Sequence, residues 1–130
     1  MRARTGRDRP TTRSGSRGQA TVELALALPV VVLVILLVVQ VALVARAQVL
    51  VVQAARQGAR AVAVGDDVGI AYDTPGLERT QMSVALSGGG SPGSLATVTV
   101  RYRAPTEVAL VGGLLGDVTV KAEVTMRVEG

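Results

Sequence analysis

Few residue types in this chain could carry out covalent chemistry. Its 130 residues include no Cys and no His, which excludes thiolate and imidazole metal ligands as well as Cys–His and Ser–His–Asp catalytic groups. The carboxylates towards the C-terminus are those of Glu107, Asp117, Glu123 and Glu129. Their spacing shows no pair that points to a catalytic cleft. We therefore expect no enzymatic activity, no catalytic residue, no cofactor and no small-molecule substrate.

A short acidic cluster is the remaining candidate for a metal site. Asp66, Asp67 and Asp73 supply the carboxylate oxygens that Ca²⁺ prefers. Their spacing matches no EF-hand loop. We interpret the cluster as a polar turn and predict no metal site.

A single carboxylate, Glu23, stands directly before the longest apolar run of the chain. This run covers residues 24–45 and is interrupted only by Pro29 and Gln40. A helix of that length spans about 33 Å at ~1.5 Å per residue, enough to cross a hydrocarbon core of about 30 Å. We predict a transmembrane helix with Pro29 in its first two turns, where a missing N–H costs least. A buried helix of a soluble protein is the alternative.

The residues before this run form a basic leader. Residues 1–18 contain six arginines and one aspartate, and Ser, Thr, Gly and Pro make up most of the rest, a composition typical of disorder. Five of these arginines lie within about 20 residues of the span, against Arg46, Arg56 and Arg60 beyond it. The imbalance favours a cytoplasmic N-terminus and an extracytoplasmic C-terminal part. A positive-inside signal accounts for the leader, so we expect no nucleic-acid partner.

A secretory signal peptide is a competing interpretation. Ala45-Arg46-Ala47 gives an A-x-A sequence at the end of the apolar run. However, the apolar region of a signal peptide is typically about 7–15 residues, shorter than this run. Cleavage there would release a soluble binding module that begins at Gln48.

Gly18 is followed by four residues, then by Glu23 and the apolar run. This junction resembles the cleavage site of type IV prepilin-like proteins. In that family an inner-membrane peptidase cuts after the glycine, and the glutamate becomes the fifth residue of the mature chain. The resemblance implies processing between Gly18 and Gln19 by a prepilin peptidase, and a role for Glu23 in assembly.

A narrower resemblance extends along the chain. Residues 18–29 (GQATVELALALP) are similar to the G-x-A-x-V-E-x-A-L-x-x-P opening of the TadE/TadG-like proteins of tight-adherence pilus systems. Residues 53–61 resemble their A-A-R-x-x-A-R segment, and residues 124–129 resemble their C-terminal end. Leu24 departs from the pattern, because the pseudopilins often have an aromatic residue there. The resemblance covers residues 18–64 well and implies partners among other pilin-like subunits or pilus assembly proteins.

Electrostatics supplies a role for Glu23 if such subunits assemble. A charged side chain costs about 2.5–3.5 kcal/mol at the bilayer centre and less near its edge. A freshly exposed α-amino group on a neighbouring subunit would offset that cost and fix the stagger between packed helices. The alternative needs no function, because a glutamate in the first helical turn is favoured by the helix dipole.

The helix is expected to continue outward to residue 64 and to end at Gly65-Asp66-Asp67. Its polar side chains gather on one side of a helical wheel, at Arg46, Gln53, Arg56, Gln57 and Arg60. The small pairs Ala54 with Gly58 and Ala55 with Ala59 permit close approach, either by a partner helix or by the chain's own sheet. Arg56 and Arg60, one turn apart, are candidates for contact with a partner's acidic face or with lipid phosphates. A solvated polar face is the alternative.

The C-terminal half shows the alternating pattern of a small sheet. Three strands are predicted, near residues 82–86, 97–103 and 118–129. Each alternates apolar with polar side chains, which predicts an antiparallel sheet covered on one side by the extended helix. The apolar residues 108–115 predict either a short helix that caps the sheet or a loop that contacts the membrane or another subunit.

The expected organisation is a basic disordered leader at 1–18, a transmembrane and amphipathic helix at 19–64 and a small extracytoplasmic β-sheet domain at 65–130. This is an α+β, pilin-like fold. The leading hypothesis is a single-pass protein of the bacterial cytoplasmic membrane that takes part in assembly of a tight-adherence-type pilus or a related secretion machine. The alternative is an unprocessed membrane accessory protein that is not part of a pilus.

Overall fold

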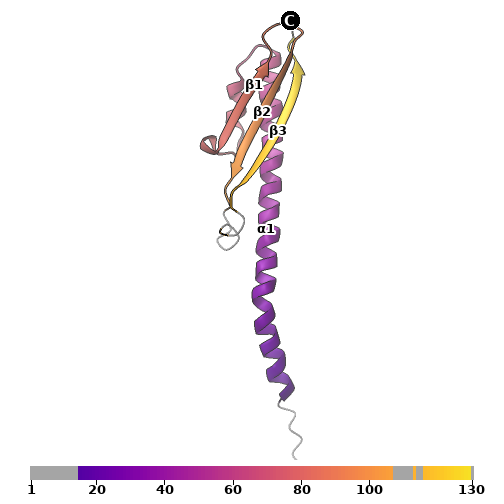
Figure 1. The fold of residues 1–130 in the computed structure, drawn as a ribbon, viewed down its shortest axis with the longest axis vertical. Helices are drawn as coiled ribbons and strands as arrows, with labels where there is room; N and C mark the ends of the chain where they lie inside the picture. The colour runs from indigo at the N-terminus through magenta and orange to yellow at the C-terminus, as the bar shows by residue number, and fades with distance from the viewer. Residues whose placement is uncertain (1–14, 107–112, 114–115, 130) are drawn as a thin grey trace, which may run out of the picture. The chain divides into compact units, whose positions relative to one another are not determined.

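The computed structural model describes residues 15–106, 113 and 116–129 (Figure 1). Its elements are α1 (Gly15–Ala63), the short 3-10 helices η1 (Val68–Asp73) and η2 (Arg79–Gln81), and the strands β1 (Met82–Gly88), β2 (Leu95–Ala104) and β3 (Val118–Arg127). The expectations for residues 1–14 and for the stretch 108–115, Gly113 apart, fall outside these residues. The chain divides into two compact units, Met1–Ile35 and Leu36–Gly130.

In the first unit the described chain is entirely helical, and from Leu24 on it is apolar on all sides. Leu24 is 68% exposed and Leu26 is 72% exposed. Pro29 lies in the interior of α1, because the helix begins at Gly15. The expectation that Pro29 falls in the first two turns is therefore wrong. Since proline has no N–H, the helical hydrogen bond from residue 29 to the Ala25 carbonyl is missing.

The end of α1 is set by a glycine. Gly65 has a φ of +82°, the left-handed conformation that commonly follows a helix. The Asp66 N–H donates to the Ala61 carbonyl at 2.8 Å, and the Gly65 N–H donates to the Val62 carbonyl at 3.1 Å. These two bonds satisfy carbonyls that the last helical turn would otherwise leave free.

The second unit contains a three-stranded antiparallel sheet with the order β1-β2-β3 (Figure 1). Val100 at the centre of β2 lies opposite Val84 of β1 and opposite Ala122 of β3. Alternate residues of β2 are buried, from Ala96 to Ala104. The antiparallel sheet with one buried face, expected from the alternating pattern, is confirmed.

A glycine pair makes the turn between β1 and β2. Gly88 and Gly89 have φ values of +80° and +84°. A Cβ on Gly88 would lie 2.3 Å from the Leu95 carbonyl oxygen. Only glycine fits this position without movement of the backbone.

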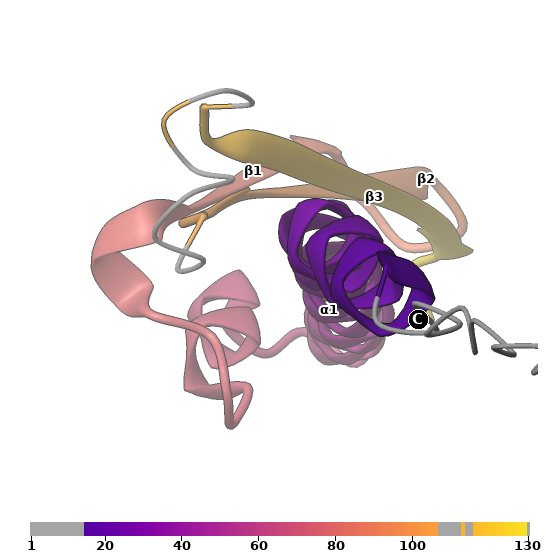
Figure 2. The same cartoon turned by 90° about the horizontal axis from the view of Figure 1, so that it is seen from below.

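The C-terminal part of α1 covers the buried face of the sheet (Figure 2). Its buried residues in the common core are Ala47, Val51, Ala54, Ala55, Ala59 and Val62. They pack against Val98 and Val100, which are fully buried on β2. The structure thus has the predicted α+β, pilin-like layout, with the helix as the cover of the sheet.

The segment between α1 and β1 is tied to both of them. Asp67 caps η1 by accepting a hydrogen bond from the Gly69 N–H at 3.0 Å. The Thr74 hydroxyl is buried and donates to the Ala71 carbonyl at 3.0 Å. The Tyr72 hydroxyl accepts a hydrogen bond from the Val84 N–H at 3.2 Å. This segment therefore closes the core on a second side of the helix.

Candidate functional site

The predicted processing and pairing residues lie together in the N-terminal part of α1. The Gln19 side-chain amide donates to a Glu23 carboxylate oxygen at 3.2 Å, and both residues are exposed. The two residues are four apart and therefore neighbours on one face of the helix. Glu23 thus has a partner in its own chain, and that partner is the residue directly after the predicted cleavage point.

Packing gives no reason for a glycine at position 18. A Cβ built on Gly18 meets no atom within 4 Å. Glycine is about 1 kcal/mol less favourable than alanine inside a helix. The position therefore carries a helix-weakening residue that its surroundings do not require.

The apolar surface that follows Glu23 is suited to a membrane. Among the residues that the structure describes, one helix is long and apolar enough to cross a bilayer, within Gly18–Ala63. Large apolar side chains from Val22 to Val41 point to all sides of this helix and are exposed. A helix that is apolar all round needs an apolar environment, either lipid or partner helices.

The four small residues singled out from the sequence are buried inside the chain's own domain. Ala54, Ala55 and Ala59 have no exposed surface. A Cβ on Gly58 would lie 3.2 Å both from the Ala71 Cβ and from the Val98 Cγ1. In this structure the close approach that they permit is made with β2 and η1.

Arg56 and Arg60 line a groove between α1 and β3. The groove has a volume of about 380 Å³, and its further lining residues are Gln53, Gln57, Val124 and Met126. Val124 and Met126 of β3 are partly buried and form an apolar floor. The ion pairs found in the described part of the chain join Arg79 to Asp73 and Lys121 to Glu123, so neither groove arginine has an acidic partner there. We call this feature the basic groove.

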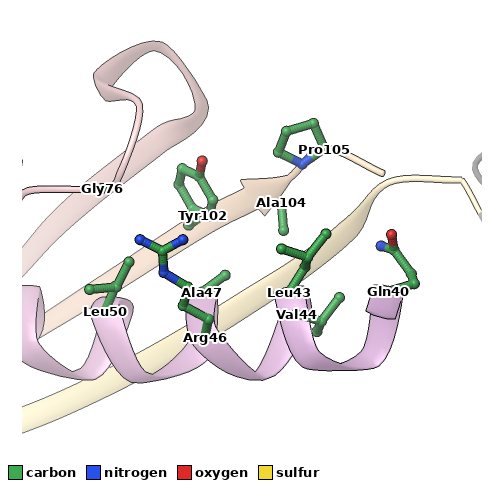
Figure 3. Close-up of a pocket in the computed structure, with 10 residues that line it drawn as sticks. All are labelled: Gln40, Leu43, Val44, Arg46, Ala47, Leu50, Gly76, Tyr102, Ala104 and Pro105. Carbon is green, nitrogen blue, oxygen red and sulfur yellow. The ribbon is translucent and has the colours of Figure 1, made fainter. Parts of the chain in front are cut away.

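A smaller hollow of about 140 Å³ lies where α1 passes the end of β2 (Figure 3). Figure 3 shows Leu43 of α1 below Ala104 at the strand end, Arg46 below Tyr102, and Leu50 further along the helix on the side of Gly76. Gln40 is only 4% exposed, and its side-chain oxygen accepts no hydrogen bond from the described residues. In the sequence Gln40 was visible only as an interruption of the apolar run, because its burial depends on tertiary packing.

Comparison with known proteins agrees with the resemblance read from the sequence. Residues 18–60 match the sequence model of the family described as TadE-like protein. This segment is TadE-like. Neither the curated proteins nor the solved structures gave a match to the chain.

The TadE-like segment contains Gly18 and Glu23 as well as both arginines of the basic groove. It ends within α1, so it does not reach the sheet. In the described ranges no three His, Cys, Asp or Glu side chains come together as metal ligands would.

Proposed function

We propose that this protein is a membrane-anchored, pilin-like subunit that takes part in assembly of a tight-adherence-type pilus or a related secretion machine. It acts through helix packing and protein contacts. The observation that carries the proposal is the Gly18–Glu23 junction at the start of a helix whose apolar side chains are exposed on all sides. The TadE-like match over the same residues supports it.

The proposed topology places the arginine-rich leader in the cytoplasm and the sheet domain outside the cytoplasmic membrane. Arginine is retained on the cytoplasmic side of a span, and within about 20 residues of this span five arginines precede it and three follow it. A prepilin peptidase would then cut between Gly18 and Gln19 at the cytoplasmic face. The freed α-amino group of one subunit would pair with Glu23 of a neighbour.

Gln19 would interact with a Glu23 carboxylate both before and after cleavage. Before cleavage its side-chain amide holds the Glu23 carboxylate within the same chain. After cleavage the same residue would carry the new α-amino group. A full positive charge binds a carboxylate more strongly than a neutral amide does. Processing would therefore shift Glu23 from a contact within its chain to one between subunits.

Mass spectrometry of the full-length protein recovered from its native membrane tests this proposal. We expect a mature chain that begins at Gln19, identified by intact mass and by its N-terminal peptide. Mass is the better readout, because an N-terminal glutamine can cyclise and block chemical sequencing. A start at Met1 would support an unprocessed accessory protein, and a start at Gln48 would support a secreted module.

Two variants sharpen the test. Gly18→Val should block processing while leaving the helix intact, because the position has open space around it. Ala20→Val, at an exposed position of the same helix, is the matched control and should be processed normally. Equal processing of both variants would contradict a specific cut after Gly18.

A further inference from the structure

The charges and the apolar floor of the basic groove are complementary to a segment that carries both acidic and apolar side chains. Arg56 and Arg60 line it without an acidic partner among the described side chains. Its floor, Val124 and Met126, is apolar and only partly buried. Two cations beside an apolar floor match a segment that carries carboxylates next to an aliphatic side chain.

The same chain presents such a segment directly after α1. Asp66 and Asp67 are exposed, and Ile70, three residues on, is 45% exposed. Asp73 is paired with Arg79, so the free negative charge here comes from Asp66 and Asp67. We call residues 66–70 the acidic turn.

Backbone hydrogen bonds hold the acidic turn in its shape before any contact forms. One oxygen of Asp66 accepts from the Asp67 N–H at 2.8 Å, and one oxygen of Asp67 accepts from the Gly69 N–H at 3.0 Å. A carboxylate has acceptor sites for more than one donor. Each aspartate therefore keeps one oxygen that can bind an arginine. Because the turn is already ordered, it would lose little conformational entropy on binding.

The groove and the turn lie on opposite sides of α1. Gly58 faces η1, since a Cβ there would lie 3.2 Å from Ala71 and 3.6 Å from Val68. Arg56 and Arg60 are each two residues from Gly58, which places them about 160° away around the helix. The two arginines therefore lie on the side of α1 opposite to its contact with η1, which follows the two aspartates in the chain.

We propose that the basic groove receives the acidic turn of a second copy of this chain. The contact rests on the proposed function, because it names the partner of one pilin-like subunit as another. It is heterologous: the surface used on one copy differs from that used on the next. Repetition of such a contact gives a ring or an open row of subunits.

The distance of the basic groove from the end of the membrane span favours a protein over a lipid as the partner of its arginines. If the span ends at residue 45, Arg56 and Arg60 lie about 16 Å and 22 Å further along the helix. The headgroup layer on each side of the hydrocarbon core is only about 5–8 Å thick. Both arginines therefore lie beyond the phosphates of the membrane that holds their own helix.

Cysteine cross-linking tests the contact in the full-length protein in membranes, because the natural sequence has no cysteine. Gln53→Cys places a thiol in the groove, and Ile70→Cys places a small apolar thiol in the turn. Mixing the two single variants should give a cross-linked dimer, and the double variant should give a ladder. Ser83→Cys, at an exposed residue of β1, replaces Ile70→Cys in the control and should give no dimer with Gln53→Cys.

Charge variants add a second readout. Asp66→Asn with Asp67→Asn keeps the oxygens that accept the backbone N–H groups, and Arg56→Gln with Arg60→Gln keeps polar side chains. Either pair should reduce cross-linking by about 2- to 30-fold, since two exposed ion pairs are each worth about 0.2–1 kcal/mol. Cross-linking should also fall as salt is raised. A copy with Arg56→Glu and Arg60→Glu should cross-link again with a copy carrying Asp66→Lys, which leaves the Asp67 cap of η1 in place.

The outcomes separate this contact from the proposed function. A chain that starts at Gln19 but gives no Gln53→Cys to Ile70→Cys product overturns the contact and leaves the pilin-like role. A chain that starts at Met1 and still gives the cross-linked product supports the contact and contradicts the proposed processing. Binding of the groove to anionic vesicles, lost with Arg56→Gln and Arg60→Gln, would assign it to lipid and overturn the contact. Capture of a different subunit in the groove would overturn it as well.

Discussion

Gly58 of α1 lies against Ala71 of η1 so closely that a Cβ at position 58 would be only 3.2 Å from the alanine methyl carbon. The same Cβ would lie 3.2 Å from Val98 of β2. Gly58 therefore stands where the helix, the returning segment and the sheet meet. A small residue at this point lets three elements share one core.

We predict that Gly58→Leu destabilises the sheet domain. The extra atoms have no free volume, and overpacking typically costs about 1–3 kcal/mol. Thermal unfolding of the full-length protein in detergent would show a lower midpoint. Gly90→Ala is the matched control, because a Cβ there meets no atom within 4 Å. An unchanged midpoint for Gly58→Leu would show that the core accommodates the larger side chain and would contradict the prediction.

Glu23→Gln should impair assembly without affecting folding or membrane insertion. The glutamine keeps the size of the side chain but cannot neutralise an α-amino group on a neighbour. Incorporation into fibres sheared from the cell surface should fall at least about tenfold, because hydrogen bonds to charged groups contribute roughly 1.5–3 kcal/mol. Glu123→Gln is the control, since Glu123 is exposed on the sheet and pairs with Lys121. Normal incorporation of Glu23→Gln would contradict the pairing role.

Local patterns were sufficient for most of the fold. The alternation over residues 118–129 predicted a strand, and β3 covers Val118–Arg127. The glycine at position 65 marked the end of α1, because the left-handed turn there suits glycine. The start of α1 was less clear, since Gly and Ser residues before Gly18 carry no periodic signal. Pro29 was misplaced because its turns were counted from Leu24, the first residue of the apolar run, whereas the helix begins at Gly15.

Only the arginines of the basic groove could be predicted from the sequence, and its apolar floor could not. A helical wheel placed Arg56 and Arg60 on one face, because that grouping depends on residues one turn apart. Val124 and Met126 could not be assigned to the same groove, since this depends on how β3 lies against α1. Such long-range placement is set by the whole core and not by local periodicity.

Tyr72→Phe should loosen β1. Its hydroxyl accepts the partly buried Val84 N–H, and the loss of such a hydrogen bond costs about 0.5–1.5 kcal/mol. We expect faster hydrogen exchange at Val84 and a lower unfolding midpoint. Tyr102→Phe is the matched control, because the Tyr102 hydroxyl makes no hydrogen bond to the described residues. Equal effects of the two variants would show that the Tyr72 hydroxyl does not hold the strand.

Gln40→Leu should stabilise the protein, because the buried side-chain oxygen of Gln40 has no hydrogen-bond partner in the described part of the chain. Removal of an unsatisfied buried polar atom should raise stability by about 1 kcal/mol or more. Leucine is close to glutamine in volume and matches the apolar neighbours Leu43 and Val44. The measurement is again the unfolding midpoint in detergent, with Val41→Leu at an exposed position of the same helix as the control. A loss of stability in Gln40→Leu would contradict the prediction and show that the amide contributes more through its contacts than its unpaired oxygen costs.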